Sequence, residues 1–155
     1  MVIKVSNFKS LLLVIVLLGT SVKADDQLRP LSEVMDQEQS KHMTNYVLQR
    51  CSALMMEMAQ RTERGEKREG SEKFISFMSK GYETFAMFSA KTISDIKGRS
   101  TSESSESLTE ALNTILKIQK MYFQQMEDEY LKSGNSLDKK TQQDLDICVK
   151  LVKMQ

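Results

Sequence analysis

Apolar residues recur at every third or fourth position along four segments of this chain, which is the spacing of one face of an α-helix. The first three segments end at glycines, namely Gly65, Gly98 and Gly134, which tolerate the left-handed backbone of a helix terminus. We expect four helices, over residues 36–64, 71–97, 108–132 and 137–155. Amphipathic helices joined by mostly short connections predict an all-α fold, an antiparallel four-helix bundle.

Two stretches lie outside these helices. Residues 25–35 are an expected lead-in, in which Pro30 stops any helix. Residues 98–107 read Gly-Arg-Ser-Thr-Ser-Glu-Ser-Ser-Glu-Ser and offer no apolar side chain to bury. That composition predicts a polar loop, either a plain connection or a docking loop. The bundle domain is therefore expected to span residues 36–155.

Two helix starts carry capping residues in the sequence. Ser107 and Glu110 match a capping box, in which the serine caps the third helix and the glutamate bonds back to it. Ser136 is the expected cap of the fourth helix.

Residues 1–24 have the layout of a secretory signal peptide. Lys4 and Lys9 form a basic start, an apolar run covers Leu11–Leu18, and a small residue, Ala24, stands at the expected cleavage site. The apolar run is shorter than the roughly 20 residues that span a bilayer, although an uncleaved signal anchor is the alternative. We expect a periplasmic or secreted protein that has no stable membrane insertion once the signal peptide is removed.

The charge balance argues against polyanionic partners. Cleavage after Ala24 removes three lysines and no acidic residue, which changes the formal net charge from +1 to −2. A nearly neutral chain has no electrostatic reason to bind nucleic acid or an anionic membrane surface.

The chain has two cysteines, Cys51 and Cys148, and both fall on the apolar faces of their predicted helices. The first and last helices of an up-and-down bundle are neighbours, and an exported chain meets an oxidising compartment. We therefore predict a Cys51–Cys148 disulfide, worth up to roughly 4–5 kcal/mol in the loop-entropy account; two buried free thiols are the alternative. Such a pairing would let Arg50 and Asp144 meet at the edge of the bundle.

Catalytic and metal-binding patterns are missing from the sequence. His42 is the only histidine, and helical spacing places it on a different face from Cys51. Without a base, a nucleophilic cysteine has no activation. Two-histidine zinc and di-iron motifs and glycine-rich phosphate loops are also missing, and an outward His42 disfavours haem. We predict a protein that is not an enzyme and has no cofactor.

Methionine is the unusual residue of this chain, with 11 copies. Met43, Met58, Met78 and Met126 fit the predicted core faces, where a flexible thioether fills irregular gaps. Met56, Met87 and Met121 fall away from the apolar stripes. They are interpreted as scattered surface residues, as an adaptable surface for a protein partner, or as soft ligands for Cu(I).

One stretch carries a resemblance. Residues 46–54 read Tyr-Val-Leu-Gln-Arg-Cys-Ser-Ala-Leu. They resemble the Tyr-x-x-x-Arg-Cys-small-small-Leu pattern of small secreted helical proteins of bacteria, in which a late second cysteine also occurs, here Cys148. The resemblance implies an exported helical fold and no particular function. Exported immunity proteins that neutralise secreted effectors are similarly small and helical, but usually carry more cysteines.

These observations favour an exported, non-enzymatic module that binds or assists another exported protein. One alternative is a periplasmic carrier of copper or of a small apolar ligand, held in a cavity along the aromatic stripe from Phe74 to Phe88. A second alternative is an inhibitor of the immunity type. The oligomeric state is left open at this point.

Overall fold

The computed structural model describes residues 28–36 and 40–154, and these ranges contain five α-helices, one short 3₁₀ helix and no strand. The elements are α1 (Leu31–Met35), α2 (Lys41–Arg64), α3 (Ser71–Lys97), η1 (Thr101–Glu103), α4 (Ser104–Ser133) and α5 (Lys139–Lys153). The predicted all-α helical bundle is confirmed, with α1 added to the four predicted helices. The predicted signal peptide, residues 1–24, lies outside the described residues.

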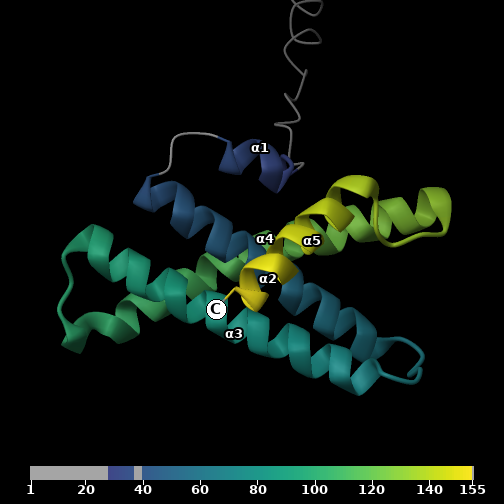
Figure 1. Cartoon of the computed structure of the whole chain (residues 1–155), viewed down its shortest axis with the longest axis horizontal. Coiled ribbons are helices and arrows are strands. Elements are labelled where there is room, and N and C mark those ends of the chain that lie inside the picture. Colours follow the sequence, from purple (N-terminus) through teal and green to yellow (C-terminus); the bar gives the residue numbers. More distant parts are fainter. Residues whose placement is uncertain (1–27, 37–39, 155) are drawn as a thin grey trace, which may run out of the picture.

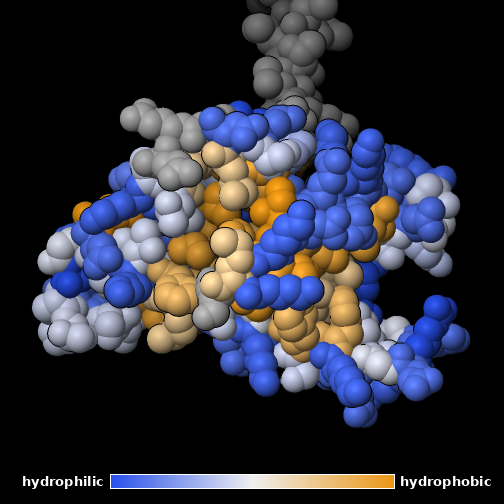
Figure 2. All heavy atoms as spheres, in the orientation of Figure 1, coloured by the Kyte–Doolittle hydropathy of each residue, from blue (hydrophilic) through white to orange (hydrophobic). Residues whose placement is uncertain are grey.

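Helix α2 is the central element of the bundle (Figure 1). Helix α3 runs antiparallel beside it, and α4 returns along α3 and then crosses behind α2. Helix α5 crosses in front of α2 in this view, and the short α1 lies above α2 and contacts both α2 and α5. Residues 49–55 are all buried, so two turns of α2 have neighbours on every side. Figure 2 shows hydrophobic side chains in the gaps between helices at the centre of one face, whereas the ends of the bundle are hydrophilic.

Helix α3 has the predicted bounds, and both of its ends carry a glycine in the left-handed conformation, Gly70 and Gly98. A third glycine, Gly81, lies in the middle of the helix for a different reason. A Cβ atom there would overlap the Met55 Sδ and lie 3.1 Å from the Met55 Cε and 3.3 Å from the Val152 Cγ2. Gly81 is therefore the place where α3 closely approaches α2 and α5.

The prediction of a lead-in over residues 25–35 is wrong for the part that the structure describes. Pro30 precedes the first turn of α1, where its missing N–H leaves no hydrogen bond unmade. Leu28, Leu31 and Val34 are buried in the core. Their spacing of three residues places all three side chains on the side of this segment that faces the bundle.

The predicted polar loop over residues 98–107 is shorter than expected, because α4 begins at Ser104. The pattern that forms a capping box is Ser100–Glu103, where the Glu103 carboxylate accepts a hydrogen bond from the Ser100 N–H at 2.9 Å. Ser107 is buried inside α4 and accepts a hydrogen bond from the hydroxyl of Ser94 at 2.9 Å. The predicted Ser107 cap is therefore wrong.

The cap of α5 is Asp138 rather than the predicted Ser136. The Asp138 carboxylate accepts a hydrogen bond from the Thr141 N–H at 2.6 Å and one from the Gln125 side chain at 2.9 Å. Burial acts to raise the pKa of Asp138, but these hydrogen bonds outweigh burial, and the pKa lies below its ordinary value.

We expect the Gly81→Ala variant to be less stable than the parent protein by about 1–3 kcal/mol, because the added methyl group forces the buried Met55 side chain and the Val152 side chain to repack. This loss exceeds the gain of up to about 1 kcal/mol from the higher helix propensity of alanine. Urea unfolding followed by circular dichroism measures the difference. The matched control is Gly65→Ala, where the nearest atom is the Arg61 carbonyl oxygen at an ordinary 3.4 Å. A Gly81→Ala variant as stable as this control would contradict the close approach.

We expect Asp138→Ala to cost about 1 kcal/mol at neutral pH, as loss of a helix cap does, and Ser136→Ala to cost much less. The folded-state pKa of Asp138 is depressed, so its stabilisation is present above the unfolded-state pKa and is lost as the pH falls through the folded-state value. The difference in unfolding free energy between parent and Asp138→Ala should therefore shrink below about pH 4. Urea titrations across the acid range test this, and an equal loss in both variants would remove the assignment of the cap.

Candidate protein-interaction surface

A buried charge cluster joins four parts of the chain. Arg50 on α2 is fully buried, and it donates hydrogen bonds to the Asp144 carboxylate of α5, to the Tyr122 hydroxyl of α4 at 2.7 Å, and to the Arg29 carbonyl ahead of α1. The Tyr122 hydroxyl donates to the Asp144 Oδ2 at 2.9 Å, and the Leu31 N–H donates to the Asp144 Oδ1 at 2.7 Å. These hydrogen bonds fix α1, α2, α4 and α5 against one another.

The electrostatics of the cluster are those of an ion pair with a neutral phenol. Burial raises the pKa of Tyr122 far above its ordinary value, so the hydroxyl keeps its proton. Burial also disfavours the charged form of Arg50, but Tyr122 and Asp144 outweigh that effect and its pKa is raised. Burial raises the pKa of Asp144 above its ordinary value, and the hydrogen bonds from Leu31 and Tyr122 and the positive charge of Arg50 offset part of that rise. Three donors on two oxygens are the environment of an ionised carboxylate.

The Arg50–Asp144 contact expected from the sequence is confirmed, but its expected place at the bundle edge is wrong. Both side chains are buried, because α1 covers them and Tyr122 reaches them from α4. Each polar group of the cluster bonds to another part of the chain, so the cluster acts as architecture. Tyr122 had no sequence signal beyond its place on an apolar face.

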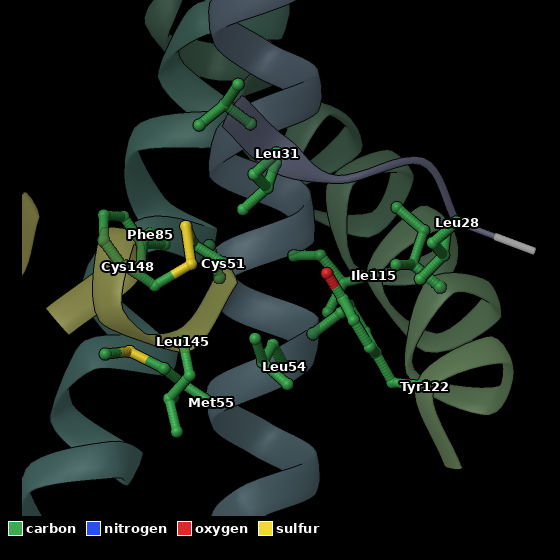
Figure 3. Packing of buried hydrophobic residues seen from close by; sticks show 14 of the residues in the cluster. Leu28, Leu31, Cys51, Leu54, Met55, Phe85, Ile115, Tyr122, Leu145 and Cys148 are labelled. Atoms are coloured by element: carbon green, nitrogen blue, oxygen red, sulfur yellow. A yellow bond between two sulfur atoms is a disulfide. The ribbon is translucent and has the colours of Figure 1, made fainter. Parts of the chain in front are cut away.

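The predicted Cys51–Cys148 disulfide is confirmed, with Cα atoms 5.2 Å apart. It lies in the core between Phe85, Leu31 and Leu145 (Figure 3). The disulfide links α2 to α5 one residue from Arg50 and one helical turn from Asp144, so covalent and ionic links hold the same pair of helices.

Met56, Met87 and Met121 lie on three different helices and differ in exposure. Met87 on α3 is 62% exposed, whereas Met56 on α2 and Met121 on α4 are half-buried and pack against the core. That these residues contact a partner or a metal ion stays a prediction. Three other exposed apolar side chains lie together on one face of α4.

That surface is a line of three residues on α4, Leu116, Phe123 and Tyr130, which we call the α4 stripe. Their exposed fractions are 45%, 38% and 54%. They are seven residues apart, and a seven-residue step turns an α-helix by only about 20° from two full turns. The three side chains therefore share one face of α4, beside the row that enters the core. On a helical wheel of residues 108–132 these three residues fall within one broad apolar face together with the core side chains.

Two arginines of α2 lie against the centre of the α4 stripe. The guanidinium carbons of Arg61 and Arg64 are 5.9 and 5.8 Å from the centre of the Phe123 ring, within cation–π range. The fully buried Glu57 holds both, with nitrogen–oxygen distances of 3.5 and 3.2 Å, and Glu127 bonds to Arg61 at 2.7 Å. Aromatic and arginine side chains are the types enriched in protein interfaces, and these arginines are already ordered.

A cavity of about 620 Å³ lies between α4 and α5. Leu28 and Met121 contribute apolar atoms, and the remaining lining side chains are charged or amide groups. None of its lining residues belongs to the aromatic stripe from Phe74 to Phe88, where the carrier alternative places a ligand. Across residues 28–36 and 40–154, no group of three or more His, Cys, Asp or Glu side chains is arranged to hold a metal ion. No helix of the described part of the chain is long and apolar enough to cross a membrane.

No protein-family model, curated protein or solved structure matches this chain. The interpretation of the α4 stripe therefore rests on the contacts within the molecule. The fold is a disulfide-linked helical bundle, and its candidate site is a surface of apolar and arginine side chains.

We expect Asp144→Ala to lower the unfolding free energy by about 3–5 kcal/mol, because it leaves the buried Arg50 guanidinium without its counter-charge. The control on the same helix is Asp146→Ala, whose exposed carboxylate accepts a hydrogen bond from Gln142 and should matter by less than about 0.5 kcal/mol. Urea unfolding under non-reducing conditions gives both values. Similar losses in the two variants would show that the cluster does not hold the fold.

Proposed function

We propose that this chain is an exported, non-enzymatic protein-binding module and that the α4 stripe is its contact surface. The observation that carries the proposal is the line of three large apolar side chains on α4 with Arg61 and Arg64 ordered beside Phe123. Large aromatic residues and arginines contribute most of the binding free energy in many protein interfaces. Scattered single apolar residues need no explanation, but a row with a helical repeat is the pattern that a partner protein contacts.

Export supports this function and is itself part of the proposal. The predicted signal peptide directs the chain out of the cytoplasm. The buried Cys51–Cys148 disulfide fits an oxidising compartment such as the periplasm or the medium outside the cell. In such a compartment a stable helical bundle can present a fixed surface to another exported protein.

The non-enzymatic part of the proposal rests on the residues available for chemistry. His42 is exposed at the start of α2, and both cysteines are in the disulfide. The buried ionisable groups around Arg50 bond to one another. A binding function requires only exposed side chains, so it is compatible with a buried cluster around Arg50 that holds the fold together.

A photo-cross-linking amino acid at position 116 tests the contact surface in the exported fraction of the native cell. We expect irradiation to give a protein adduct from position 116 and much less from position 117. Lys117 is the matched control, since it is exposed on the same helix but about 100° around from Leu116. Equal labelling at both positions, or none at either, would contradict the α4 stripe as a binding surface.

A further inference from the structure

The α4 stripe is symmetric about its central residue. Leu116 lies seven residues before Phe123, and Tyr130 lies seven residues after it. A two-fold axis perpendicular to α4 at Phe123 would place Leu116 opposite Tyr130 of a second copy and Phe123 opposite itself. A surface that is complementary to itself in this way is what a two-fold dimer requires.

We propose that the α4 stripe is the interface of a homodimer in which two α4 helices pair in antiparallel orientation about Phe123. This inference rests on the proposed function, because it names a second copy of this chain as the partner of the same surface. The exposed pair Met87 and Phe88 on α3 lacks such a repeat, since neighbouring residues on a helix point about 100° apart.

Two charged residues on one flank of the stripe set the orientation. Lys120 and Glu127 are seven residues apart and lie on the same side of α4, each with an accessible side chain. They are separated by about 10 Å along their own helix, which is too far for an ion pair. In the antiparallel arrangement Lys120 of one copy lies within one residue of the level of Glu127 of the other. In a parallel two-fold arrangement the same flanks of the two copies would lie on opposite sides of the interface, so Lys120 and Glu127 would not meet across it.

The arginines beside Phe123 do not prevent this pairing. Two positive charges, Arg61 and Arg64, come close to the two-fold axis in each copy. The two carboxylates of Glu57 and Glu127 contact them, so each copy brings a balanced patch to the axis. The guanidinium groups add polar contacts around an apolar centre, as in the rim of many protein interfaces.

The first experiment is sedimentation equilibrium of the mature, oxidised protein over about 1–500 µM, because an interface of a few residues on each side gives a weak dimer. We expect a reversible monomer–dimer equilibrium. Phe123→Glu should raise the dissociation constant by at least about 30-fold, as loss of a central interface residue does. The control Met87→Glu, on an exposed position of α3, should leave it unchanged. A monomer throughout this range would overturn the dimer.

Charge exchange tests the antiparallel geometry. Lys120→Glu and Glu127→Lys should each weaken dimerisation alone, and an equimolar mixture of the two variants should dimerise, because each cross-pair then joins opposite charges. A chain with both substitutions should dimerise as the parent does. This double variant also controls for the lost Arg61–Glu127 contact, since it lacks that contact as Glu127→Lys does. No recovery in either the mixture or the double variant would overturn the arrangement.

The two proposals fail separately. A monomeric protein that still cross-links from position 116 to a different exported protein would end the dimer and keep the proposed function. A monomeric protein without a cross-linked partner would end both.

Discussion

The arrangement of the helices depends on the hydrogen bonds and the ion pair that the buried guanidinium of Arg50 makes. A charge without access to water is tolerated only when all of its partners are in place. Those partners come from α4, from α5 and from the residues ahead of α1, so none of these elements can move without leaving a buried polar group unpaired. The adjacent disulfide ties α5 to α2 at the same level. This combination explains why α1 and α5, which are short and would be marginal as isolated helices, lie against α2 in fixed positions.

The same cluster sets the rotation of α4 and therefore what α4 presents to the outside. Tyr122 must face Arg50 for its hydroxyl to bond to the guanidinium and to Asp144. Phe123 is the next residue, about 100° around the helix, so with Tyr122 in the core Phe123 lies to one side of the core-facing row. Ile115 and Leu116 repeat this relation one heptad earlier, with the first buried and the second exposed. One rotation of α4 thus sets which row enters the core and which row lies beside it.

Much of the fold could be predicted from the sequence because the helical period is strong and local. The bounds of α3 and the Cys51–Cys148 pair follow from apolar spacing and glycine positions. The position of the capping box, in contrast, could not be predicted from the local sequence. Ser100–Glu103 and Ser107–Glu110 are the same motif seven residues apart, and only tertiary contacts select between them. Ser107 bonds to Ser94, and Glu110 bonds to Lys97 at 2.7 Å, so the second pair serves the α3–α4 contact. The buried place of Arg50 also could not be predicted, because it needs residues up to 94 positions away.

The α4 stripe could not be predicted from the sequence for a related reason. A helix wheel describes one helix, and it assigns every apolar residue near the core direction to the core. Whether Leu116 or Phe123 is covered depends on where α2 ends and how α4 crosses it, which the wheel does not contain. The structure places the guanidinium groups of Arg61 and Arg64, from the last turn of α2, over the Phe123 ring, which stays 38% exposed. The buried Glu57 carboxylate contacts both arginines and holds their side chains near Phe123. Their positive charges in turn compensate the buried negative charge of Glu57. The α2–α4 crossing therefore produces both the apolar row and the arginines held next to it. Because these arginine side chains are already held in place, a second chain that binds the row would cost little of their conformational entropy.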